Sequence, residues 1–284
     1  MNDKSNGNPD YLVIGHITHD LHAGGYTIGG TAAYASLTAK SLGRIPAVLT
    51  AGGKKQPSNE LNGIIQKWKY SPVFTAFENI ETGKGRKQIL RSIADDLMPE
   101  DVSSNWQDVS IVHLGPVANE VHPDIMDVFP NAVIGLTPQG WMRARDENNV
   151  VHFHPWKHAD KLLQRANAVV LSIEDVLGDF NLISSFANKT DLLAVTEGNN
   201  GAFIYSEGKI HHFSAPKVQA VDPTGAGDIF AAVFFDQFER SRDPWASART
   251  AVHIASYSTT RTGLGGIPTP DEIDSFRNAV AEGK

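Results

Sequence analysis

The 284-residue sequence has no cysteine, no long apolar run and no excess of positive charge. The absence of cysteine excludes disulfide bonds, thiolate metal ligands and cysteine nucleophiles. No uninterrupted apolar stretch approaches the roughly 20 residues that a membrane-spanning helix needs. The formal net charge of −7 argues against nonspecific binding to nucleic acids or anionic membranes, because such binding requires a basic surface. We therefore expect small-molecule partners, with no nucleic-acid and no membrane partner.

The N-terminal residues 1–9 also lack the apolar segment of a secretory signal. Their polar composition predicts a flexible tail. We expect residues 10–284 to form a single domain, since a chain of this length can bury one large core. Without a targeting signal, the expected location is the cytoplasm.

Short apolar runs separated by helical or loop segments predict an α/β fold with a mainly parallel sheet. Core strands are expected at residues 11–15, 47–50, 111–114, 132–136, 168–171 and 192–196. A hairpin is expected at 203–213, and helices at 31–42, 61–68, 226–239, 244–260 and 270–281. Residues 16–28 and 72–93 break this alternation, which predicts loop or antiparallel excursions from the sheet.

The most informative segment is 221–230, with the sequence VDPTGAGDIF. Gly225, Ala226 and Gly227 carry little or no side chain, so their backbone N–H groups can approach an anion closely. The apolar residues that follow predict a buried helix, whose positive N-terminal end would strengthen anion binding. Asp228 stands where a carboxylate could accept a proton from a hydroxyl group. The segment therefore predicts a phosphoryl-transfer site, and a glycine-containing cap of a packed helix is the alternative.

This segment resembles the C-terminal signature of the PfkB/ribokinase family, D-x-T-G-A-G-D-x-F, at every fixed position. The order of expected elements is similar to that family over residues 10–282. The resemblance implies a three-layer α/β/α ribokinase-like fold with a mainly parallel central sheet and a small β lid, formed here by residues 16–28 and 72–93. It also implies an ATP- and Mg²⁺-dependent phosphotransferase with Asp228 as catalytic base and the amides of Gly225–Gly227 as an anion hole.

The first part of the chain holds the acceptor-binding residues that the resemblance implies. Asp20 follows the first strand, where the family places an acidic residue that binds substrate hydroxyls. Gly29, Gly30 and Thr31 are similar to the family's Gly-Gly signature, at which the backbone approaches the substrate. The lysine and asparagine of the ribose-binding pattern are absent, and Tyr34 introduces an aromatic ring. An inositol-like polyol is therefore favoured over ribose, as in the inositol-kinase-like branch of the family.

Basic and polar residues of the expected lid add further substrate-binding candidates. Arg86 and Gln88 lie in this segment, where basic residues could hold a substrate phosphate or clamp the nucleotide. Arg143 follows the strand expected at 132–136 and is a third candidate. A sugar-phosphate kinase and a nucleoside kinase of the same family therefore remain open. A catalytically silent binding protein on the kinase fold is also open.

The nucleotide-binding candidates lie in the second half of the chain. Thr196, Gly198 and Gly201 form a T-x-G-x-x-G pattern that is similar to the family's nucleotide segment. Thr224 and Gly263 are further candidates. Relatives with a monovalent-cation site bind the ion with oxygens from these last two regions, and the sequence leaves K⁺ binding open.

Glu174 and Asp175 follow the strand expected at 168–171, at the place of the family's N-x-x-E segment. In the family this segment arranges Mg²⁺ and phosphate through water, and Ser172 replaces the asparagine here. Two acidic residues in the first turn of a helix are equally compatible with a structural role. The oligomeric state is open between a monomer and a lid-mediated homodimer.

Overall fold

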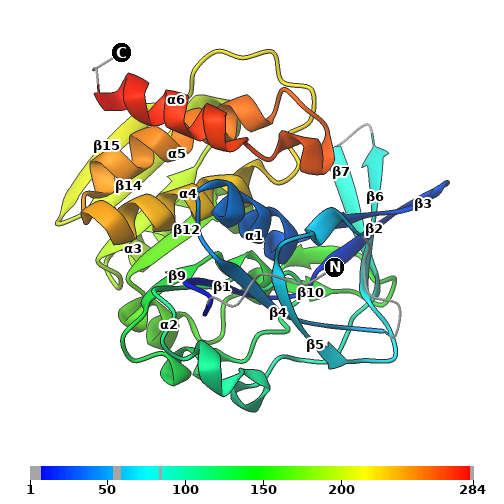
Figure 1. Cartoon of the computed structure of the whole chain (residues 1–284). Helices are drawn as coiled ribbons and strands as arrows, with labels where there is room; N and C mark the ends of the chain where they lie inside the picture. Colours follow the sequence, from blue (N-terminus) through cyan, green and yellow to red (C-terminus); the bar gives the residue numbers. More distant parts are fainter. Residues whose placement is uncertain (1–7, 54–58, 83–84, 282–284) are drawn as a thin grey trace.

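A computed structural model of the chain describes residues 8–53, 59–82 and 85–281. In these residues, a nine-stranded central sheet has the strand order β15-β14-β13-β12-β9-β8-β1-β4-β5 (Figure 1). Its strands are β1 (Tyr11–Ile14), β4 (Pro46–Gly52), β5 (Ile65–Tyr70), β8 (Ile111–Leu114), β9 (Val133–Leu136), β12 (Ala168–Ser172), β13 (Leu192–Thr196), β14 (Gly201–Ser206) and β15 (Lys209–Ser214). Neighbouring strands pair in parallel except at β13–β14 and β14–β15. The expected mainly parallel sheet is confirmed.

Burial on both faces explains why the central segments form strands. In β1, Tyr11 and Val13 pack in one hydrophobic cluster, whereas Leu12 and Ile14 pack in another. All four side chains are fully buried. Such a pattern is typical of a parallel strand that is covered on each side.

Helices cover both faces of the central sheet (Figure 1). One face carries α1 (Thr31–Ser41), α4 (Ala226–Ser241), α5 (Pro244–Ser258) and α6 (Pro270–Ala281). The other face carries α2 (Ala159–Arg165), α3 (Phe180–Ala187) and the 3-10 segment Pro123–Val128. The expected three-layer α/β/α arrangement is therefore confirmed. Of the helices in the described residues, none is both long and apolar enough to span a bilayer.

A second sheet of four strands, in the order β3-β2-β6-β7, forms the lid. Its strands are β2 (Thr18–His22), β3 (Gly25–Gly29), β6 (Thr75–Thr82) and β7 (Gly85–Ser92). The chain enters it twice, after β1 and after β5. Strands β2 and β6 pair in parallel and join the two excursions, 16–28 and 72–93, into one sheet.

Buried polar side chains tie the lid to the central sheet. His16 Nε2 lies 3.1 Å from the carbonyl oxygen of Asp95, so this nitrogen carries the ring proton. His16 Nδ1 then accepts a hydrogen bond of 2.7 Å from Thr75 Oγ1. Thr75 Oγ1 in turn accepts the N–H of Ala94 at 3.0 Å. These bonds connect both excursions where they leave the central sheet.

The prediction of a helix at residues 61–68 is wrong. A short 3-10 turn ends at Leu61, and Gly63 has a positive φ of 82°, which interrupts a helix. Strand β5 follows and pairs in parallel with β4. Ile65 and Trp68 pack on opposite faces of the sheet, so the apolar residues of this segment serve two clusters rather than one side of a helix.

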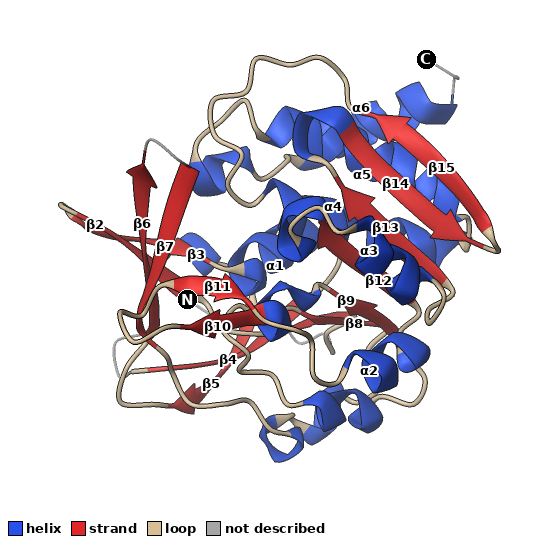
Figure 2. Cartoon of the chain, turned by 180° about the vertical axis from the view of Figure 1, so that it is seen from behind, coloured by secondary structure: helices blue, strands red, loops and turns tan. Residues whose placement is uncertain are grey.

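A small hairpin, β10 (Arg143–Arg145) and β11 (Val151–Phe153), lies beside the lid (Figure 2). The loop of this hairpin is bridged to β7 through the pair Ile89 and Val150. The sequence patterns did not predict it, because its strands are only three residues long.

Candidate active site

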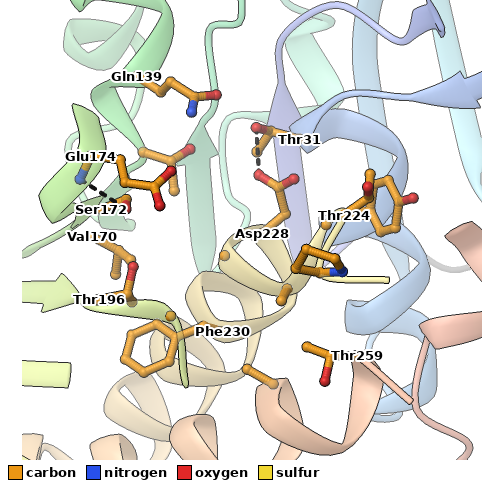
Figure 3. A pocket seen from close by; sticks show the side chains of 18 of the residues that line it. Thr31, Gln139, Val170, Ser172, Glu174, Thr196, Thr224, Asp228, Phe230 and Thr259 are labelled. Atoms are coloured by element: carbon orange, nitrogen blue, oxygen red, sulfur yellow. Dashed lines mark hydrogen bonds between the residues drawn. The ribbon is translucent and has the colours of Figure 1, made fainter. Parts of the chain in front are cut away.

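A cavity of about 750 Å³ lies between the lid, the carboxyl ends of the central strands and the N-terminus of α4 (Figure 3). Ligands of open α/β sheets bind at this edge. We call the part next to the lid the lid end; it is lined by Thr18, Asp20, Gly30, Thr31, Tyr34, Phe77, Gln88, Val117, Thr137, Gln139 and Arg143. We call the other part the distal end; it is lined by Thr196, Gly198, Gly201, Lys217, Val218, Ala220, Val252, Ala255 and Thr259. Residues 223–228 lie between the two ends.

The N-terminus of α4 depends on close packing at Gly225. This residue is the N-cap, with φ 79° and ψ −4°. A Cβ atom here would lie 2.2 Å from ring atoms of Tyr34, so only glycine fits. The N–H of Ala226 donates to the Pro223 carbonyl oxygen at 3.1 Å. A Cβ on Gly227 would meet no atom within 4 Å, and the Gly227 amide is among the first-turn N–H groups to which a helix offers no internal partner.

Asp228 lies in the first turn of α4 and faces the cavity. Its Oδ1 accepts a hydrogen bond of 2.6 Å from Thr31 Oγ1 at the start of α1 (Figure 3). Burial raises the pKa of Asp228 to about 6, although the Thr31 hydrogen bond lowers it. The charge of Arg143 also lowers this pKa, whereas the charges of Asp175 and Asp20 raise it. A carboxylate with this pKa is ionised at neutral pH yet more basic than an ordinary aspartate, which suits a general base.

Asp222 fixes the loop that precedes α4. Its Oδ1 accepts the N–H of Thr224 at 2.9 Å, and its Oδ2 accepts the N–H of Gly263 at 2.8 Å. The N–H groups of Val221 and Asp222 both donate to the Thr259 carbonyl oxygen. Thr224 lines the cavity as expected for a nucleotide-binding residue, but Gly263 is not among the described residues that line it. Gly263 instead supports the loop through Asp222.

Of the acceptor-binding candidates of the first segment, Asp20, Gly30, Thr31 and Tyr34 line the lid end, whereas Gly29 is not among the described residues that line the cavity. Asp20 lies on β2, and a Cβ on Gly29 of the neighbouring β3 would lie 2.4 Å from Asp20 Oδ2. Gly30 has a φ of 84°, and a Cβ there would lie 2.7 Å from a backbone carbonyl oxygen. Gly29 therefore allows the backbone to pass close to Asp20, and Gly30 allows it to pass close to the backbone of His16. Gln88 on β7 lines the same end, and its Nε2 donates to Asn79 Oδ1 at 3.0 Å.

Arg143 reaches the lid end from the start of β10. Its Nη1 donates to the carbonyl oxygen of Val117 at 3.0 Å. Its guanidinium carbon lies 5.8 Å from the centroid of the Phe77 ring, which belongs to β6 of the lid. The side chain therefore places a positive charge among the carboxylates of the cavity.

In residues 172–175, one carboxylate is hydrogen-bonded within the protein and the other is exposed. The carboxylate of Asp175 accepts the N–H of Ser172 at 2.8 Å and the Nε2 of Gln139 at 2.8 Å. Burial raises the pKa of Asp175. Glu174 is exposed and lines the cavity, so it is the better placed of the two for an ion held through water. In the part of the chain that the structure describes, no three acidic or histidine side chains are grouped to bind a metal directly.

Thr196, Gly198 and Gly201 lie where β13 turns into β14. Gly201 has a φ of 111°, and a Cβ there would lie 1.9 Å from the carbonyl oxygen of Phe213 in β15. Close strand packing therefore requires this glycine. Gly198 has a φ of 56°, and a Cβ there would meet no atom within 4 Å. The open space above Gly198 leaves room for a ligand at the distal end.

Several cavity residues were not expected from the sequence. They are Thr18, Phe77, Val117, Thr137, Gln139 and Lys217. Thr137 and Gln139 share the loop after β9 with Arg143, so their place behind a strand was the available signal. Phe77 and Lys217 had no such signal, because only the folded lid and the distal loop bring them to the cavity. Arg86 lies on β7, but its side chain is outside the described residues, and its role stays a prediction.

The fold and the cavity define this protein as an α/β/α protein of the ribokinase-like class. It is similar to a pyrophosphate-dependent kinase in the ribokinase family, solved with a pyrophosphate analogue and myo-inositol, at a TM-score of 0.79 and 20% identity, over 93% of this chain and 99% of that one. It is also similar to a ribokinase from Thermotoga maritima at a TM-score of 0.73 and 19% identity, over 95% of this chain and 99% of that one. The expected fold class, with its lid, is confirmed.

Residues 164–271 match the family model described as pfkB family carbohydrate kinase. The fructokinase of Escherichia coli is 30% identical over 161 residues, which make up 51% of each chain. The deoxyribokinase of Salmonella typhi is 37% identical over 85 residues, 30% of this chain and 28% of that relative. The chain therefore spans about half or less of the length of these curated relatives. The expected resemblance to the PfkB/ribokinase family is confirmed.

Proposed function

We propose that the protein is an ATP-dependent kinase that phosphorylates a hydroxyl group of a small, uncharged polyol, either a sugar or a cyclitol. The observation that carries this proposal is the position of Asp228. Its carboxylate lies in the first turn of α4, where backbone N–H groups point toward an anion, and it faces the same cavity as Asp20. Transfer of a phosphoryl group to an alcohol needs a base and a group that binds the phosphoryl oxygens, and this site offers both.

The reaction follows from these positions. Asp20 accepts hydrogen bonds from acceptor hydroxyls and orients the reactive one toward the N-terminus of α4. Asp228 accepts the proton of this hydroxyl as its oxygen attacks the γ-phosphorus of ATP. A new P–O bond forms, the bond to the β-phosphate oxygen breaks, and ADP leaves with the electron pair. The first-turn amides of α4, including that of Gly227, stabilise the negative charge of the transferred group.

The distal end of the cavity supports a nucleotide donor. Val218, Ala220, Val252 and Ala255 give it an apolar lining that suits a nucleobase, and Lys217 lies among them. We therefore favour ATP over pyrophosphate, although one structural neighbour is described as pyrophosphate-dependent. A reaction that consumes ATP also keeps the cytoplasm as its proposed location.

Mg²⁺, when bound, supplies neutralisation of the donor's phosphate charge. Glu174 is the residue that we expect to hold it through water, because its carboxylate is exposed at the cavity. Asp175 is less suited, since Ser172 and Gln139 already donate hydrogen bonds to its two oxygens.

Two carboxylates near the lid end, beside the guanidinium of Arg143, favour a neutral acceptor. The carboxylates of Asp20 and Asp228 both line the cavity near this end, and like charges disfavour an acceptor that already carries phosphate. The aromatic ring of Tyr34 lies beside them and suits the apolar face of a ring-shaped polyol. An inositol-like acceptor therefore remains our first choice, and a structural neighbour is described in complex with myo-inositol.

A screen for ADP release tests this function. The purified protein is assayed with ATP and Mg²⁺ against sugars, inositols, nucleosides and sugar phosphates, with and without K⁺. We expect turnover with an unphosphorylated polyol. Nucleotide binding without turnover on any acceptor would identify a silent binding protein, and a preference for a sugar phosphate would contradict the neutral acceptor.

Replacement of the base gives a second test. Asp228→Asn should lower kcat by about 10²–10⁴-fold, because the attacking hydroxyl loses its proton acceptor. Calorimetry should show that nucleotide binding is retained. Asp243→Asn is the matched control: Asp243 caps α5 away from the cavity, and asparagine is an equally good cap. Full activity of Asp228→Asn would contradict the mechanism.

A further inference from the structure

Arg143 lies between the lid and the reactive carboxylates, yet the reaction as described above does not use it. Its guanidinium is fixed on one side by the Val117 carbonyl oxygen at 3.0 Å and on another by the Phe77 ring. Its positive charge lowers the pKa of both Asp228 and Asp175. The side chain therefore acts on the centre of the cavity from a held position.

A third hydrophobic cluster includes Phe77 and Val117, the two residues named above as contacts of the Arg143 guanidinium. The lid contributes Phe77, Leu90 and Ile93, the loop after β8 contributes Val117 and Ala118, and strand β11 contributes Val151. We call this group the lid cluster. It is separate from the two clusters that cover the central sheet, and it contains Phe77 and Val117, which contact the Arg143 guanidinium.

Backbone contacts join the same parts. Ile89 of β7 is bridged to Val150, and the N–H of Leu90 donates to the carbonyl oxygen of Asn149 at 2.9 Å. Strands β10 and β11 pair with each other in antiparallel register, so Arg143 lies opposite Phe153 in the same hairpin. Figure 2 shows this hairpin beside the lid strands. The lid, the hairpin and Arg143 are thus connected by packing and by backbone hydrogen bonds.

The negative charges that line the cavity explain why a cation is needed near Asp228. Asp20, Asp228, Glu174 and Asp175 all line the cavity, and a phosphoryl group adds further negative charge. A guanidinium group offers planar, paired N–H donors that match phosphate oxygens. It is also always protonated, so its charge does not depend on pH near neutrality.

We propose that Arg143 is a catalytic residue that binds the non-bridging oxygens of the transferred phosphoryl group, and that the β10–β11 hairpin positions it through the lid cluster. This inference deepens the proposed kinase function and rests on it for the turnover measurement. A purely structural Arg143, which only supports the loop at Val117, is the alternative.

Binding of pyrophosphate with Mg²⁺ tests the contact without turnover. Calorimetry should show about 10- to 100-fold weaker binding to Arg143→Gln than to the unmodified protein, the loss expected when hydrogen bonds between charged groups are removed. Arg143→Lys should give an intermediate affinity, because it keeps the charge and loses the paired donors. Arg145→Gln is the matched control, since Arg145 lies on the same strand and bonds Asn149 at an exposed position. Equal affinity of Arg143→Gln and unmodified protein, or no pyrophosphate binding at all, would overturn the inference.

Turnover separates this inference from the proposed function. Arg143→Ala should lower kcat by about 10²–10³-fold, as loss of one group that stabilises transition-state charge does in other enzymes. Guanidinium ions added to the assay should restore part of the rate. If the unmodified protein turns over and Arg143→Ala retains its kcat, the role of Arg143 is refuted while the kinase function stands. If the unmodified protein shows no turnover, the kinase function fails and the pyrophosphate titration still decides on Arg143.

Within the lid cluster, we assign the role of positioning Arg143 to Val151. Val151→Ala should lower kcat by about 10-fold with little change in the acceptor KM, because a small displacement of a catalytic group is costly. Val151→Ile should restore the rate. His152→Ala changes the opposite face of the same strand and should leave kcat unchanged. A loss of thermal stability with unchanged kcat for Val151→Ala would show that the lid cluster is structural only.

Discussion

At the scale of single residues, the proposed chemistry depends on how Thr31 holds Asp228. The two residues are 197 positions apart in the sequence, and their hydrogen bond joins the start of α1 to the start of α4. The bond fixes one carboxylate oxygen and favours the ionised form of Asp228. Thr31 therefore lowers the pKa of the proposed base and also orients its carboxylate.

Removal of this hydroxyl should be visible in a pH profile. Because the Thr31 hydrogen bond lowers the pKa of Asp228, Thr31→Val should raise it above its value of about 6. The proposed base must be ionised to accept a proton, so the acidic limb of the kcat/KM profile should move to higher pH. Arg143, Asp175 and Asp20, the other charged groups that act on Asp228, are unchanged in this variant.

Thr31→Ser is the matched control for this experiment. It keeps the hydroxyl donor and should leave the acidic limb in place. A limb that stays at the same pH in Thr31→Val would show that a different group controls the profile.

Residues within one segment could be predicted from the sequence, whereas contacts between segments could not. Gly225 and Asp228 were recognisable because their spacing and the helix that follows are local features. The hydrogen bonds of Gln139 to Asp175 and of Gly263 to Asp222 could not be predicted from the sequence. Each of them joins two loops that meet only in the folded chain. The sequence assigned Asp175 to a metal and Gly263 to the nucleotide. The structure adds their hydrogen bonds within the protein, and both assignments stay predictions.

At the scale of elements, the N-terminus of α4 uses two glycines for different reasons. Gly225→Ala should lower the free energy of unfolding by about 1–2 kcal/mol from the left-handed backbone alone, and the clash with Tyr34 adds to this. Gly227→Ala should keep the stability, because its Cβ meets no neighbour within 4 Å. The added methyl group would, however, occupy space at the anion-binding face and weaken nucleotide binding.

Urea unfolding and nucleotide calorimetry on the two variants test this difference. Each variant serves as the control for the other, since both add one methyl group within three residues. Equal destabilisation by the two changes would contradict the assignment.

The type of an element could be predicted from the sequence where its residues are uniformly buried. The prediction failed where the apolar residues of a segment pack in two different clusters. The strand Tyr11–Ile14 and the helix Ala226–Ser241 were predicted to within two residues. The edge strand Ile65–Tyr70 was expected to be part of a helix, because its apolar residues belong to two clusters. The β10–β11 hairpin was not expected, since its strands are held by the lid rather than by a pattern of their own.

At the scale of the whole molecule, a buried ionic cluster ties together segments from both ends of the chain. Asp236 on α4 is fully buried. Its carboxylate lies 2.6 Å from Arg44 Nε, 3.0 Å from Arg240 Nε and 3.4 Å from Arg277 Nη2. Arg44 follows α1 and Arg277 lies on α6, so one carboxylate connects three helical regions.

Asp236→Ala should lower the free energy of unfolding by up to about 3–5 kcal/mol, because it removes the buried partner of Arg44 and leaves this buried guanidinium with the more exposed Glu239. Urea unfolding measures this loss. Asp274→Ala is the matched control, since Asp274 pairs with the same Arg277 at 3.6 Å but is 71% exposed. It should change the stability by less than about 1 kcal/mol. A similar effect of both changes would show that burial does not determine the contribution.

The overall architecture was predictable as a class, because alternating apolar runs and helices admit few parallel arrangements. That residues 16–28 and 72–93 form one sheet could not be predicted from a local sequence pattern. It depends on the parallel pairing of β2 with β6 and on His16, which bonds Thr75 and Asp95 at the base of the lid.

The packing of the Tyr34 ring against Gly225 links the wall of the proposed acceptor site to the loop of the proposed phosphate site. In evolutionary terms, positions 34 and 225 form an epistatic pair. No side chain is tolerated at 225 while the ring remains, and a new residue at 34 must still leave the glycine loop supported. Diversification of acceptor range is therefore expected to proceed through positions of the lid strands outside the lid cluster and outside the close contact of Asp20 with Gly29, because those two groups are under joint constraints of their own.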